Sequence, residues 1–180
     1  MFKKILLVIA VIVALFLVVA AFQPSEYRVV RSATIPAPAA IVFAQANDLH
    51  RWNAWSPWAK LDPSAQYHFD GPPAGNGASM SWAGNDQVGE GRMTITESRP
   101  NELLRMKLNF LKPFASTADT EFTFKGTGNE TVMTWTMSGR KNFMSKAVCL
   151  FMNMDKMVGG QFEQGLANLK QVVSSGAAKQ

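Results

Sequence analysis

The chain has 180 residues, 47% of them hydrophobic, which supports one good core and gives no sign of a second globular domain. Its net charge is +5, but no cluster of lysines and arginines is interleaved with aromatic residues, so we do not expect a nucleic-acid partner. Cys149 is the only cysteine, which excludes an intramolecular disulfide and a metal cluster held by thiolates. Its apolar neighbours predict a buried, unreactive thiol.

The chain begins with an apolar segment. Residues 5–22 contain no charge, proline or glycine, and they follow Lys3 and Lys4. Eighteen such residues are near the lower limit for a helix that crosses a membrane, and they exceed the roughly 7–15 residues of a usual signal-peptide core. We therefore predict a single-pass anchor in residues 1–22, with a cleaved signal peptide as the alternative. In both cases the lysines favour export of the rest of the chain to the periplasmic or extracellular side.

The rest of the chain is predicted to form one domain close to the membrane. Residues 23–25 are a linker, too short to let the domain move far from the bilayer. Residues 26–174 carry the periodic patterns of a folded domain, and residues 175–180 form a small polar tail.

The domain starts with a strand and two short helices. Residues 27–35 are rich in valine and threonine and predict the strand. The helices follow at residues 39–44 and 49–55, and Asn47 or Asp48 can cap the second of them.

From Gln66 onward the pattern changes to short strands separated by turns of glycine, proline and asparagine. The clearest strand covers residues 104–110, where apolar and polar residues alternate, so one face is buried and the other is wet. Because all the connections are short, neighbouring strands are predicted to be antiparallel. A meander of about six strands results, or six to seven in the whole sheet.

A long helix is predicted at residues 142–174. Its apolar residues recur every three or four positions and form one face that must be buried. The simplest partner for that face is the curved sheet, which gives an α+β fold with the helix laid across it. Gly159 and Gly160 interrupt the helix pattern and predict a kink or a close approach.

Several short motifs carry a resemblance to a known family. They are Arg31-Ser32 with Ile35-Pro36-Ala37-Pro38, then Trp52-Asn53-Ala54-Trp55-Ser56-Pro57-Trp58, and Met157-Val158-Gly159-Gly160-Gln161-Phe162. With the order of elements, they resemble the bacterial polyketide cyclase/dehydrase-like branch of the START-like, Bet v 1-like (SRPBCC) superfamily. The resemblance implies a helix-grip fold with an apolar cavity between sheet and helix. Members bind or carry lipids, sterols, polyketides or quinones, and only some are enzymes.

No set of residues in the sequence converges on catalysis. His50, His68, Glu90 and Asp119 are the groups closest to candidates, and strand parity places most of them in solvent. We predict no catalytic residue, no metal site and no cofactor, because acid and base groups must meet in one pocket to act.

Bulky aromatic and methionine side chains are the main indication of a binding site. Strand parity and four-residue helical steps place a set of them between the sheet and the first half of the long helix. The predicted ligand-binding residues are Trp55, Trp58, Met80, Trp82, Phe110, Phe122, Trp135, Met144, Val148 and Met152. We further expect the methionine-rich first half of the helix to lift at Gly159 and Gly160 to admit a ligand.

The sequence thus predicts a membrane-tethered domain that binds or carries a hydrophobic small molecule or lipid without covalent chemistry. One alternative is a cyclase or hydratase acting on a polyketide-like apolar substrate. The other is an envelope domain that only contacts other proteins. A cavity of roughly 300 Å³ or more is expected for the carrier, and a filled gap for the interaction domain. The oligomeric state stays open.

Overall fold

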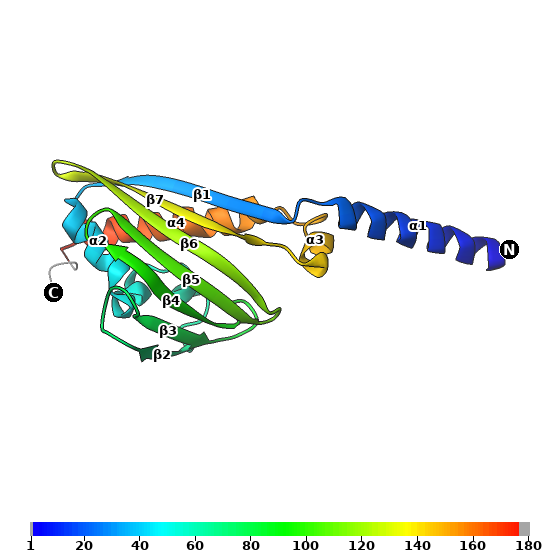
Figure 1. The fold of residues 1–180 in the computed structure, drawn as a ribbon, viewed down its shortest axis with the longest axis horizontal. Coiled ribbons are helices and arrows are strands. Elements are labelled where there is room, and N and C mark those ends of the chain that lie inside the picture. Colours follow the sequence, from blue (N-terminus) through cyan, green and yellow to red (C-terminus); the bar gives the residue numbers. More distant parts are fainter. Residues whose placement is uncertain (1, 177–180) are drawn as a thin grey trace.

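A computed structural model describes residues 2–176 of the chain. Residues 177–180 of the predicted tail and Met1 of the predicted anchor lie outside the described residues. Figure 1 shows a curved sheet wrapped around one long helix, with a separate helix projecting from one end. The predicted α+β helix-grip fold is confirmed.

Seven antiparallel strands form one sheet in the order β1-β7-β6-β5-β4-β3-β2. Strands β2 to β7 are a meander. Strand β1 forms one edge of the sheet and pairs with β7 from Glu26↔Arg140 to Ile35↔Thr131. The strands are β1 Glu26–Ile35, β2 Gln66–Asp70, β3 Ser79–Ala83, β4 Glu90–Arg99, β5 Leu103–Lys112, β6 Ser116–Thr127 and β7 Glu130–Arg140.

The alternation of apolar and polar residues along the strands determines which face of the sheet is buried. In β6, Thr120 and Phe122 are buried, whereas Asp119 is exposed and Glu121 is half-buried on the other face. A shift by one residue would bring those carboxylates into the core, so the polarity pattern determines the register.

The helices are α1 Phe2–Phe22, α2 Ala39–Asn47, α3 Phe143–Val148 and α4 Met154–Ser174, with 3-10 turns η1 Leu49–Ala54 and η2 Trp58–Lys60. Asp48, one of the two residues predicted to cap this segment, caps η1 by accepting a hydrogen bond from the backbone N–H of His50. By length and composition α1 is able to cross a membrane, and among its residues only Ala20 is buried.

The prediction of one helix over residues 142–174 is wrong, because the chain forms α3 and α4 with a break between them. The side chain of Asn153 accepts a hydrogen bond from the backbone N–H of Lys156 and starts α4 anew. A continuous helix of this length would measure about 50 Å, whereas a strand as long as β7 spans about 36 Å. The sheet is therefore too short to cover such a helix.

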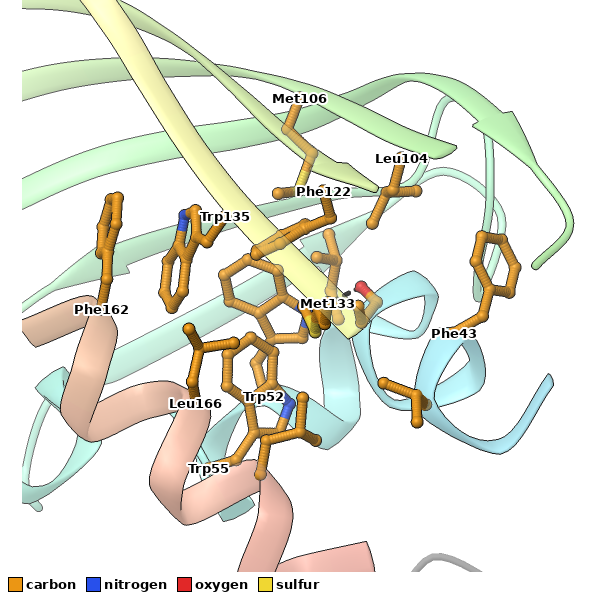
Figure 2. Packing of buried hydrophobic residues seen from close by; sticks show 14 of the residues in the cluster. Phe43, Trp52, Trp55, Leu104, Met106, Phe122, Met133, Trp135, Phe162 and Leu166 are labelled. Carbon is orange, nitrogen blue, oxygen red and sulfur yellow. Dashed lines mark hydrogen bonds between the residues drawn. The ribbon is translucent and has the colours of Figure 1, made fainter. Parts of the chain in front are cut away.

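Aromatic side chains fill the centre of the domain between sheet, α4 and η1 (Figure 2). Trp135 of β7 stacks on Phe162 of α4, with ring centroids 4.0 Å apart and an angle of 8° between the planes. Trp55 and Phe122 are fully buried and contact Trp135, the first in an edge-to-face arrangement and the second with tilted rings. These contacts join the two halves of the chain into one core.

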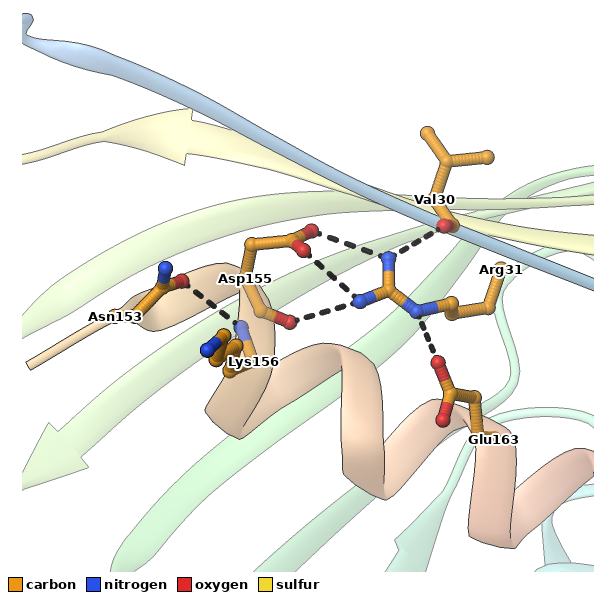
Figure 3. A network of polar contacts seen from close by, with 6 residues as sticks. All are labelled: Val30, Arg31, Asn153, Asp155, Lys156 and Glu163. Atoms are coloured by element: carbon orange, nitrogen blue, oxygen red, sulfur yellow. Dashed lines mark hydrogen bonds and ion pairs between the residues drawn. The ribbon is translucent and has the colours of Figure 1, made fainter.

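An arginine ties β1 to α4 (Figure 3). The guanidinium of Arg31 donates to Asp155 at 2.9 Å and to Glu163 at 2.5 Å, two residues that lie on either side of Gly159 along α4. The hydrogen bond from Arg31 lowers the pKa of the Asp155 carboxyl, so this pair stays ionised at neutral pH. Gly159 is buried under the guanidinium, and any Cβ there would overlap it. The expected close approach is thus present.

The two adjacent glycines give a matched test of this contact. Gly159→Ala should give a lower free energy of unfolding than Gly160→Ala, because the new methyl group displaces Arg31 from its carboxylates and this loss opposes the gain in helix propensity. Gly160→Ala should raise the free energy of unfolding by up to about 1 kcal/mol, because no atom lies within 4 Å of its Cβ position and alanine favours helix. Chemical denaturation followed by tryptophan fluorescence measures both. Equal effects of the two substitutions would show that Arg31 moves aside without loss.

Candidate functional site

A cavity of about 210 Å³ lies between the concave face of the sheet, the η1–η2 segment and the start of α4. It is lined by Trp52, Asn53, Ser56, Trp58, Tyr67, Met80, Trp82, Val88, Met93, Met106, Leu108, Phe110, Thr120, Trp135, Met137 and Val158. None of these residues is charged at neutral pH, since burial and the nearby Asp62 raise the pKa of the Tyr67 phenol further. The space between sheet and helix is therefore not filled by side chains, but the cavity is smaller than the 300 Å³ expected for a carrier.

Five of the predicted ligand-binding residues line this cavity: Trp58, Met80, Trp82, Phe110 and Trp135. Trp55 and Phe122 do not, because both are 0% exposed and lie within the packed core beside it. Their rings contact the ring of Trp135.

The other three predicted residues lie elsewhere. Met144 and Val148 belong to α3 and Met152 to the loop after it, and their exposed fractions are 57%, 41% and 45%. The expectation that they face the sheet is wrong. Phe151, one of the apolar residues on the helix face that was predicted to be buried, is 81% exposed. The idea of a lid hinged at Gly159 loses its basis, because the methionine-rich segment already lies outside the sheet–helix layer.

Sequence reasoning missed eleven lining residues, several of which had a usable pattern. Met106 and Leu108 share the buried parity of Phe110 on β5, and Met93 and Met137 occupy buried positions of β4 and β7. The remaining ones are Trp52, Asn53, Ser56, Tyr67, Val88, Thr120 and Val158. Val158 belongs to the apolar face predicted for the long helix. Loop residues had no such signal, because their direction depends on the turn.

Two buried polar atoms of residues that line the cavity have no hydrogen-bond partner among the described residues: Nε1 of Trp135 and Oγ1 of Thr120. The other indole groups that are mostly buried do have partners. Trp52 Nε1 donates to the carbonyl of Ala46 at 2.8 Å, and Trp55 Nε1 donates to that of Gln45 at 3.2 Å. Trp135 is therefore an exception among the three buried tryptophans.

The four titratable groups named as candidates from the sequence lie outside the cavity. The four candidates each have a partner on the surface: His50 with Asp48 at 3.2 Å, His68 with Asp70 at 3.1 Å, Glu90 with Lys112 at 2.5 Å and Asp119 with Lys107 at 3.5 Å. Within residues 2–176 no group of three or more His, Cys, Asp or Glu side chains could hold a metal ion.

Two further groups bear on chemistry. Asp62 is a buried carboxylate, and hydrogen bonds from the Ser64 hydroxyl and the backbone N–H of Asn85 lower its pKa, so it serves as an ionised turn anchor. The thiol of Cys149 is only half-buried, so the prediction of a buried cysteine is wrong.

A second, larger hollow of about 510 Å³ lies where β1 meets the loop between α3 and α4. Its walls include Arg28, Lys141 and Asp155, so charged groups line it. An apolar ligand would have to desolvate those charges, which makes the smaller cavity the better candidate site.

The geometry defines a class: a helix-grip domain with an uncharged, mainly apolar cavity under its sheet. The sequence profile of the family described as "Polyketide cyclase / dehydrase and lipid transport" matches residues 26–174. The chain belongs to this family, which confirms the predicted polyketide cyclase/dehydrase-like branch and a hydrophobic-ligand type of domain. A search of curated proteins gives no match.

Solved structures show the same fold at low sequence identity. Protein MLL2253 from Mesorhizobium loti has a TM-score of 0.61 at 18% identity, with 83% of this chain and 98% of that chain covered. Ara h 8.0201 has a TM-score of 0.56 at 11% identity, with 83% and 99% covered. DynU16, a protein of the dynemicin biosynthetic locus, has a TM-score of 0.57 at 17% identity, and the match covers 83% of this chain but 48% of that one.

The position of the titratable groups predicts the outcome of an alanine series. His50→Ala, His68→Ala, Glu90→Ala and Asp119→Ala should each change ligand affinity less than threefold, because none of the four side chains lines the cavity. Binding titrations of the full-length protein measure this, with Trp135→Leu as the positive control. A loss of about a hundredfold or more in a cellular activity at unchanged stability would instead indicate a general acid or base.

Proposed function

We propose that the chain is a membrane-tethered domain that binds a small hydrophobic molecule in the cavity under its sheet, without covalent chemistry. The observation that carries this proposal is the cavity itself, whose walls are mostly aromatic and methionine side chains and include no charged group. Such walls favour transfer of an apolar ligand out of water, and they include no carboxylate, histidine or lysine that could act on it as an acid or base. This argues against the cyclase or hydratase alternative.

The volume of the cavity limits the size of the ligand. A dry cavity of about 150 Å³ can hold benzene, so 210 Å³ suits a molecule with one or two rings, or one end of an isoprenoid or acyl chain. A whole membrane lipid does not fit. Four methionines in the wall, Met80, Met93, Met106 and Met137, can change rotamer and adapt the shape to the ligand.

The surface next to α1 supports attachment to a membrane. Phe151 stacks on Phe16 of α1 at 5.9 Å, and Lys146 Nζ donates to the carbonyl of Ala21 at 3.3 Å. Large apolar side chains around this contact are exposed, among them Phe143 and Met144. Exposed apolar residues at the end of a membrane helix are expected to lie in the interfacial layer of the bilayer.

A substitution in the cavity wall tests ligand binding. Geraniol should quench tryptophan fluorescence of the full-length protein in lipid nanodiscs saturably, after subtraction of empty nanodiscs. Val158→Trp should weaken this binding at least tenfold by filling the cavity, whereas Val172→Trp, on the same helix outside the cavity, should not. Trp135→Leu should remove much of the quenching. If no apolar ligand of this size gives a saturable response, the binding proposal fails and the interaction domain takes its place.

Membrane topology is tested separately. A reporter fused after Gln180 should be active outside the cytoplasm and stay in the membrane fraction, because the apolar residues 5–22 of α1 follow Lys3 and Lys4. A shortened soluble form would show that residues 1–22 are a cleaved signal. Reporter activity in the cytoplasm would show the opposite orientation.

A further inference from the structure

The two buried, unpaired polar atoms belong to residues that line the cavity from neighbouring strands of the sheet. Thr120 of β6 pairs with Met137 of β7, and Trp135 is two residues from Met137. Thr120 and Trp135 are therefore diagonal neighbours on one face, with their Cα atoms about 7–8 Å apart, a distance that an aromatic side chain can bridge. Both residues line the cavity, and their exposed fractions are 3% and 2%.

Neither group can find its partner by a small movement of the protein. The Trp135 ring is held by its stack on Phe162 and by the edges of the surrounding aromatic rings. Thr120 is β-branched and stands in the middle of a paired strand, so its χ1 angle is restricted. A buried donor or hydroxyl without a partner is unfavourable, and such groups are rare in folded proteins. The only other one among the described residues, Gln45 Nε2, does not line the cavity.

We infer that Trp135 and Thr120 form a polar anchor for the ligand, which is a neutral apolar molecule carrying a carbonyl or hydroxyl oxygen at the end buried in the cavity. A carbonyl oxygen accepts from the Trp135 N–H and from the Thr120 hydroxyl. A hydroxyl oxygen accepts from Trp135 and donates to Thr120, whose oxygen is both donor and acceptor. This inference rests on the proposed function and narrows its ligand class.

The other residues of the cavity wall disfavour a ligand with a charged group at its buried end. No lysine, arginine or histidine lines the cavity, so a carboxylate or phosphate group would be buried without a counter-charge. No carboxylate lines it either, so an ammonium group has the same difficulty. A pure hydrocarbon fits the apolar wall but leaves both anchor groups unsatisfied. An oxygen-bearing ring or chain end is the chemistry that satisfies all of these conditions.

A pair of probes that differ in one carbonyl group tests the anchor. 1-Tetralone and tetralin have the same fused rings, and isothermal titration calorimetry with the full-length protein in nanodiscs compares them after subtraction of empty nanodiscs. The wild-type protein should bind 1-tetralone at least tenfold more tightly than tetralin. Thr120→Val and Trp135→Phe should each reduce that preference at least threefold, and Thr120→Ser should keep it.

Controls separate the anchor from general packing. Trp58→Phe changes another indole of the wall and should weaken both compounds equally, so that the preference is unchanged. Thr120→Val should not lower the melting temperature of the ligand-free protein, because it removes an unsatisfied hydroxyl and keeps the shape of the side chain. This result would show that any loss of preference is not a folding defect.

Three results would overturn the inference. If both probes bind equally to the wild type, water and not the ligand satisfies the two groups, while the proposed binding function stands. If 1-tetralone is preferred but both Thr120→Val and Trp135→Phe keep the full preference, the oxygen is bound elsewhere. If neither probe binds to the cavity, the proposed function fails together with the anchor.

Discussion

The stack of Trp135 on Phe162 is the contact on which the arrangement of sheet and helix depends. Gly165, about one turn after Phe162 on α4, allows the approach, because a Cβ there would lie 2.9 Å from Cζ3 of Trp135. A stacked pair contributes about 0.5–1.5 kcal/mol beyond the burial of its surface. Since Trp135 belongs to the aromatic core and also to the cavity wall, the contact that fixes the fold also fixes the shape of the site.

Strands and their inward faces could be predicted from the sequence because a half-buried sheet forces polarity to alternate. Met80, Trp82 and Phe110 line the cavity for this reason. The same parity could not distinguish a residue of the core from one of the cavity wall. Phe122 and Trp135 are neighbours on one face, yet only Trp135 reaches the cavity. That difference depends on how side chains of several elements pack together, which cannot be predicted from the sequence pattern of one strand.

The long helix was the main error, and its cause is physical. Met144, Val148 and Met152 recur every four residues, as expected for one face of a helix. Helical spacing shows only that one face avoids water. It does not record whether protein or lipid covers that face, because both are apolar. Asparagine at position 153 could have indicated the new helix start, but one capping residue is a weak signal within a periodic run. The length of the sheet is the stronger argument, since strands of 10–12 residues cannot cover a helix of 33.

The core and the cavity occupy opposite ends of the same concave face. Along β5, Leu104 is fully buried, Leu108 is 8% exposed and Phe110 is half-buried, so packing loosens toward the turn between β5 and β6. Figure 1 shows this turn at the end of the domain from which α1 leaves. On β7, Met137 lies three residues before Arg140, which pairs with Glu26 at the start of the domain. If α1 is anchored in a bilayer as proposed, the cavity lies in the half of the domain nearest to that bilayer, so an apolar ligand leaving the membrane would need to cross little water to reach it.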